Sequence, residues 1–119
     1  MLNAEDLKNF TEKFQTSNRN VVREYIQSMF LSALYKIEGS GKLLFKGGTA
    51  LRLVYQSPRF SEDLDFTGQR IYRTEEIDDL FIAAMAEVEK AGTAISFKEA
   101  KPTTGGYLGL IHYEANDQV

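Results

Sequence analysis

Residues 45–51 (FKGGTAL) and residues 59–66 (RFSEDLDF) carry most of the information about the architecture of this chain. In the first stretch, a pair of glycines separates a short apolar run from a segment with helical spacing. In the second, Leu64 and Phe66 alternate with acidic residues. Successive side chains of a strand point to opposite faces, so this alternation predicts a strand with one apolar and one acidic face. The two stretches together predict a strand, a glycine turn, a helix and a second strand.

Further helices and strands are predicted on both sides of this unit. Apolar spacing predicts helices over residues 3–16, 22–37 and 49–56, and another between an N-cap at Thr74 and a stop at Gly92; strands are predicted over residues 43–45, 63–66, 95–97 and 107–113. The continuous apolar run 43–45 is typical of a strand that is buried on both faces. This order predicts an α/β (α+β) fold, with a mixed sheet flanked by helices.

Composition excludes several classes of protein and of site. The 119 residues fit one domain, the absence of cysteine excludes disulfides and thiolate chemistry, and a single histidine excludes multi-histidine metal sites. No apolar run approaches the ~20 residues of a membrane-spanning helix, and the N-terminus lacks an apolar signal core, so we expect a cytoplasmic protein without membrane contact. Residues 42–73 contain six basic and three acidic side chains, a local charge of +3 in a chain of net charge −3. Basic residues around clustered acids suit a phosphate-bearing ligand that is bound together with a metal.

The two motifs have a direct chemical interpretation. The glycines Gly47 and Gly48 allow the backbone to approach a ligand closely, and the helix that follows presents free N–H groups and a positive dipole end, to which Thr49 adds a hydroxyl. Asp63 and Asp65 project from the same face of their strand. Two carboxylates that close are costly without a cation between them, and Mg²⁺ binds one or two carboxylates together with phosphate oxygens.

Each motif also has a purely structural interpretation. A glycine pair can be a plain turn, an Asp-x-Asp pattern can be the solvent face of an edge strand, and Arg59 can pair with Glu62 at the surface. Lys46 can be a solvent-facing strand end rather than a phosphate ligand. The combination of the two motifs, in this order and about a dozen residues apart, is much more specific than either motif alone.

Residues 46–51 followed by residues 59–66 resemble the signature of the AbiEii/AbiGii-type nucleotidyltransferases. These proteins belong to the DNA polymerase beta-like nucleotidyltransferase superfamily and include toxins of abortive-infection and toxin–antitoxin systems. The resemblance is strongest over residues 42–67. It implies a minimal nucleotidyltransferase fold and a metal-dependent reaction that transfers a nucleotide from a nucleoside triphosphate to an RNA (tRNA-like) or protein acceptor, with a cognate antitoxin as a partner.

The resemblance also implies roles for individual residues. Asp63 and Asp65 correspond to the catalytic aspartates that bind Mg²⁺ or Mn²⁺. The nucleotide-binding positions of the family correspond to Lys46, Gly47, Gly48, Thr49, Arg59 and Ser61.

The chain departs from the family pattern at its end. A third acidic residue is expected on a strand just beyond residues 107–113, and Glu114 and Asp117 are the nearby acids. We therefore expect residues 1–119 to be a single nucleotidyltransferase-like domain that represents the N-terminal part of a longer protein. It would consist of a helical part, residues 1–41, and a catalytic-type core, residues 42–119. The alternative function is a module that binds a nucleotide or an antitoxin without turnover.

Overall fold

The computed structural model describes residues 2–58, 60–68, 73–93, 95–103 and 106–113. Within these residues the chain forms helices and strands in the order α1 (Ala4–Phe14), α2 (Asn18–Tyr35), β1 (Leu43–Lys46), α3 (Gly47–Tyr55), β2 (Asp63–Gly68), α4 (Thr74–Lys90), β3 (Ile95–Thr103) and β4 (Gly106–Tyr113). This arrangement confirms the predicted α+β class and is compatible with a minimal nucleotidyltransferase fold.

The four described strands form one sheet in the order β1-β2-β4-β3. All three pairings are antiparallel, so the sheet differs in this respect from the mixed sheet that we expected. The reason lies in the connection through α3. Lys46, the last residue of β1, pairs with Asp65 near the start of β2, so the chain re-enters the sheet beside the point where it left. A parallel pairing would require a crossover that runs back along the strands.

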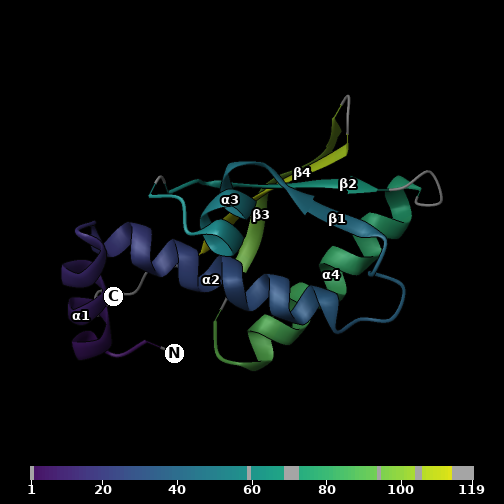
Figure 1. Cartoon of the computed structure of the whole chain (residues 1–119). Helices are drawn as coiled ribbons and strands as arrows, with labels where there is room; N and C mark the ends of the chain where they lie inside the picture. The colour runs from purple at the N-terminus through teal and green to yellow at the C-terminus, as the bar shows by residue number, and fades with distance from the viewer. Residues whose placement is uncertain (1, 59, 69–72, 94, 104–105, 114–119) are drawn as a thin grey trace.

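Helices α2 and α4 cover one face of the sheet, and α1 packs against α2 (Figure 1). The core between helices and sheet contains a cluster of aromatic side chains. Phe81 of α4 makes edge-to-face contacts with Phe30 of α2, Phe66 of β2 and Tyr107 of β4, at ring-centroid distances of 5.2, 5.4 and 5.1 Å. Such pairs contribute about 0.5–1.5 kcal/mol each beyond the burial of their area. This cluster holds β2 and β4, the two central strands, against both helices.

The structure corrects two local predictions. Residues 43–45 were expected to be buried on both faces, but Leu44 is 48% exposed because β1 is an edge strand and the helices cover only one face of it. Thr74 was expected to be the N-cap of α4; it is the first helical residue, and Arg73 occupies the N-cap, with its backbone N–H donating to the Glu76 carboxylate at 3.3 Å. None of the helices in the described ranges combines the length and the apolar character of a membrane-spanning helix.

Candidate functional site

Asp63 and Asp65 lie on the face of β2 that α2 and α4 leave uncovered. The intervening Leu64 and the following Phe66 are fully buried, so strand alternation turns both carboxylates to the opposite face. Lys46 of β1 is directly opposite Asp65 and therefore lies on this face as well. The predicted acidic face thus exists, and it carries a basic residue beside the second aspartate.

The glycine pair at the start of α3 lies directly against the acidic strand. Gly47 has a φ of +85°, which L side chains rarely adopt, and a Cβ at this position would lie 2.5 Å from Oδ2 of Asp65. A Cβ on Gly48 would lie 3.2 Å from Oγ of Ser61. Glycine is therefore required at position 47, by its φ and by the Asp65 carboxylate, whereas Gly48 lies close against the Ser61 hydroxyl. The structure brings together both predicted motifs.

Two buried polar side chains hold the motifs together. Thr49 is buried, and its hydroxyl donates a hydrogen bond to the backbone carbonyl of Asp63. Gln27 of α2 is also buried, and its Nε2 donates to the carbonyl oxygens of Ser61 and Glu62, both at 3.1 Å. The Thr49 side chain therefore joins α3 to β2, and its hydroxyl contact to phosphate stays a prediction.

Sequence reasoning missed Gln27, although a signal for it exists. Gln27 precedes Phe30 and Leu34 at the spacing of one helix face, and both of these residues are fully buried. A polar side chain on a buried helix face needs a hydrogen-bond partner. Its partners are the carbonyls of the segment that leads into β2, so Gln27 positions the acidic strand from the helical layer.

The environment of Asp63 is strongly negative. Burial raises the pKa of its carboxyl group, and the charges of Asp65, Glu62 and Glu99 raise that pKa further. Glu99 reaches this face through a β-bulge in β3: the register shifts between Phe97, which pairs with Ile111, and Glu99, which pairs with Leu110. A bulge reverses the alternation of a strand. It therefore turns Glu99 toward the face that Asp63 occupies, which periodicity alone does not reveal.

This arrangement suits a divalent cation that is bound together with a phosphate ligand. No side-chain hydrogen bond or ion pair to Asp63 or Asp65 is present among the described residues. No group of three or more acidic or histidine side chains within the same residues is arranged to hold a metal. Mg²⁺ characteristically binds one or two carboxylates and takes its other ligands from water and phosphate oxygens. The two aspartates fit that donor set and do not form a preformed cage.

The family comparison agrees with this geometry. The family model described as nucleotidyl transferase AbiEii toxin, type IV toxin–antitoxin system, matches residues 29–117. The chain belongs to the AbiEii nucleotidyltransferase toxin family. The match includes all four strands, α3, α4 and both motifs. Searches among curated proteins and among solved structures found no matching protein.

Membership of the AbiEii family indicates the class of protein and one kind of partner. The family consists of toxin–antitoxin nucleotidyltransferases, and its type IV toxin–antitoxin description implies a cognate antitoxin as a partner. The match also shows that the resemblance carried by residues 46–51 and 59–66 extends over most of the chain.

A depression with a volume of about 620 Å³ lies at the AbiEii motifs. Its lining combines residues of α3, the segment that follows it and the start of β2: Gly48, Leu51, Ser57, Phe60, Ser61, Glu62 and Asp63. We call this hollow the site depression. Three of the predicted site residues, Gly48, Ser61 and Asp63, line it.

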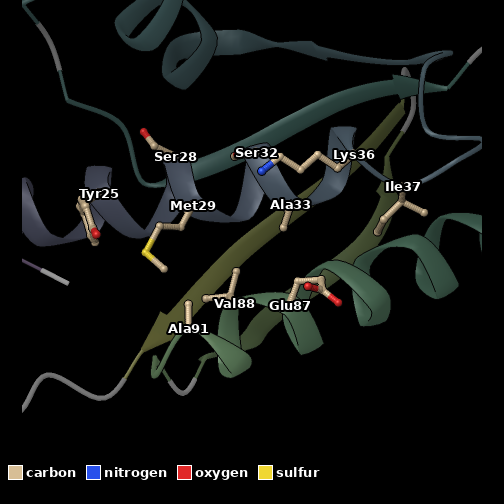
Figure 2. Close-up of a pocket in the computed structure, with 10 residues that line it drawn as sticks. All are labelled: Tyr25, Ser28, Met29, Ser32, Ala33, Lys36, Ile37, Glu87, Val88 and Ala91. Atoms are coloured by element: carbon tan, nitrogen blue, oxygen red, sulfur yellow. The ribbon is translucent and has the colours of Figure 1, made fainter.

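Not every hollow is lined by residues of these motifs. One of about 600 Å³ lies between α2 and α4, with Met29 and Ala33 facing Val88 and Ala91 across it (Figure 2). None of the predicted site residues lines it. Among the predicted nucleotide-binding residues, Arg59 lies outside the described residues, as do the two candidates for a third acid, Glu114 and Asp117.

Proposed function

We propose that this chain binds a nucleoside triphosphate together with Mg²⁺ or Mn²⁺ and transfers its nucleotide to an acceptor hydroxyl on an RNA or a protein. The observation that carries the proposal is the close approach of Gly47 to Asp65, which places the start of α3 beside that carboxylate, and Gly48 lines the same depression as Asp63. Backbone N–H groups at a helix start bind phosphate, and carboxylates bind the cation that accompanies it. Both ends of a metal–triphosphate complex therefore find suitable ligands at one place.

The reaction would proceed by displacement at the α-phosphorus. A bond forms between the acceptor oxygen and the α-phosphorus, the bond from that phosphorus to the bridging oxygen breaks, pyrophosphate leaves, and the hydroxyl proton passes to solvent. Asp63 and Asp65 would hold the divalent ion, and the N–H groups of the Gly47–Gly48 turn would orient the phosphates. When bound, the ion supplies charge neutralisation for the phosphate oxygens. Catalysis of this kind consists mainly of positioning and electrostatic stabilisation.

The test is calorimetric titration of each ribonucleoside triphosphate in the presence of Mg²⁺. In the variant with both Asp63→Asn and Asp65→Asn, the affinity should fall at least roughly tenfold, since the charge that holds the ion is removed while the shape is retained. Asp79→Asn removes an exposed carboxylate of α4 and is the matched control. Equal affinity in the double variant and the wild type would refute the metal-binding role.

A second candidate function is nucleotide or antitoxin binding without turnover. It is favoured by the site composition, because the described residues offer two carboxylates for the ion and no third in a metal-holding arrangement. The two candidates differ in one measurement, the transfer of label from an α-³²P nucleoside triphosphate to RNA and to protein acceptors. Incorporation that depends on Asp63 and Asp65 supports transfer, whereas tight binding without incorporation supports the binding module.

A further inference from the structure

The site depression has two chemically different parts. Its polar part consists of Gly48, Ser57, Ser61, Glu62 and Asp63, whereas Leu51 and Phe60 contribute apolar surface to the same hollow. A nucleoside triphosphate has the same division, with a charged triphosphate at one end and a base with apolar faces at the other. The proposed function uses only the polar part and leaves the apolar part without a role.

Leu51 is the first part of this apolar surface. It lies on α3, one helical turn after Gly48, and the residue is 53% exposed. A leucine exposed to that extent contributes little to the core, and its side chain is accessible to a ligand. Because Leu51 and Gly48 lie on the same short helix, a ligand held at the glycine turn lies within reach of the Leu51 side chain.

Phe60 is the second part, and it is held in a defined position. The guanidinium of Arg52 lies 4.0 Å from the centroid of the Phe60 ring. Arg52 is itself fixed, since its Nε pairs with the Glu24 carboxylate of α2 at 2.8 Å and its Nη1 donates to the carbonyl of Ser57 at 2.9 Å. The Arg52 side chain is only 10% exposed. The ring is therefore positioned before any ligand arrives, which lowers the entropic cost of binding.

We propose that Leu51 and Phe60 form the contact surface for the nucleoside part of the triphosphate, with Arg52 as the residue that positions Phe60. This inference rests on the proposed function and deepens it. With the phosphates at Gly48 and Ser61, the base has the apolar part of the same depression beside it, and the volume of about 620 Å³ lies in the range of small-molecule sites. Contact through an aromatic ring and an aliphatic side chain recognises the face of a base, which all four bases share. The surface therefore selects nucleotides as a class over inorganic polyphosphates.

The experiment compares two ligands on the same variants. Affinities for a ribonucleoside triphosphate and for inorganic tripolyphosphate, both with Mg²⁺, are measured calorimetrically for the wild type, Leu51→Ala, Phe60→Ala and Val54→Ala. Val54 lies on the same helix, is 62% exposed and does not line the depression, so it is the matched control. Leu51→Ala places the best helix former at an exposed helix position, so we expect this variant to fold. It therefore keeps the test valid even if Phe60→Ala unfolds.

We expect the nucleotide affinity to fall roughly fivefold or more in Phe60→Ala and roughly threefold or more in Leu51→Ala. Tripolyphosphate affinity should stay unchanged in Leu51→Ala, and Val54→Ala should bind both ligands as the wild type does. Unchanged nucleotide affinity in Leu51→Ala would overturn the inference, as would an equal loss for both ligands. If the wild type bound tripolyphosphate and nucleotide equally well, the inference would fail and the proposed phosphate site would stand. If it bound neither ligand, both would fail.

Discussion

Replacing Gly47 with alanine tests the central contact of the site. The substitution has two costs that the structure separates. The first is conformational, because a φ of +85° costs an L-residue roughly 1–2 kcal/mol. The second is steric, because the new Cβ would lie 2.5 Å from Oδ2 and 3.2 Å from both Cβ and Cγ of Asp65, inside the 3.4–4 Å of ordinary contact. Displacing a packed side chain costs about 1–3 kcal/mol, and Asp65 should move away from the glycine turn.

Gly92→Ala is the matched control for this experiment. Gly92 has a φ of +98°, and a Cβ there would meet nothing within 4 Å, so that variant bears the conformational cost alone. Urea unfolding should give a loss of about 1–2 kcal/mol for Gly92→Ala and about 1–3 kcal/mol more for Gly47→Ala. Magnesium-dependent nucleotide binding should fall only in Gly47→Ala, because only that substitution displaces a proposed metal ligand. Equal losses of stability and intact binding in both variants would refute the close approach of Gly47 to Asp65.

Three further perturbations have expected outcomes. Gln27→Leu leaves two backbone carbonyls before β2 without their donor and should lower the free energy of unfolding by about 1–3 kcal/mol in urea; a loss below 0.5 kcal/mol, roughly the scatter of surface substitutions, would contradict the role of this side chain. Burial and the hydrogen bond to Asp78 raise the pKa of the Tyr107 hydroxyl, and Tyr107→Phe should cost about 1–2 kcal/mol of stability, whereas Tyr55→Phe, at an exposed position, should cost none. Because the pKa of Asp63 is raised, the stabilisation by its carboxyl group is full below the ordinary pKa of 3.8 and is lost as the pH rises through the raised pKa. Asp63→Asn should therefore be more stable than the wild type at neutral pH without Mg²⁺. A difference in the free energy of unfolding between the two proteins that stays constant from pH 3 to pH 7 would argue against this.

Several features of the fold could be predicted because their causes are local. The helical stripe of residues 22–37 and the alternation around Asp63 and Asp65 depend on neighbours along the chain, and the structure has α2 and β2 at these places. Ser17 occupies the N-cap of α2, where its side chain accepts a hydrogen bond from the backbone N–H of Asn20, a contact between close neighbours along the chain. Gly92 follows α4 with a positive φ, as its predicted role as a stop requires.

Other features could not be predicted because they depend on pairing between distant segments. Leu44 is exposed because β1 lies at the edge of the sheet and the helices cover only one of its faces, and periodicity contains no information on either. The bulge in β3 turns Glu99 toward Asp63 through a register shift, whereas uninterrupted alternation would turn it to the other face. Gln27 acquires its role only when α2 packs over the segment that precedes β2.

The sequence by itself determined the α+β class, the two motifs and the common face of Asp63 and Asp65, because residue type and short-range spacing decide these. Only the tertiary structure decided that Gly47 lies against Asp65, that the Thr49 hydroxyl donates a hydrogen bond to the Asp63 carbonyl, and that Leu51 lines the same depression as the polar site residues. The physical reason is that side-chain periodicity acts within one element. Contacts between elements follow from the register of the sheet and from the aromatic core that holds β2 and β4 against α2 and α4.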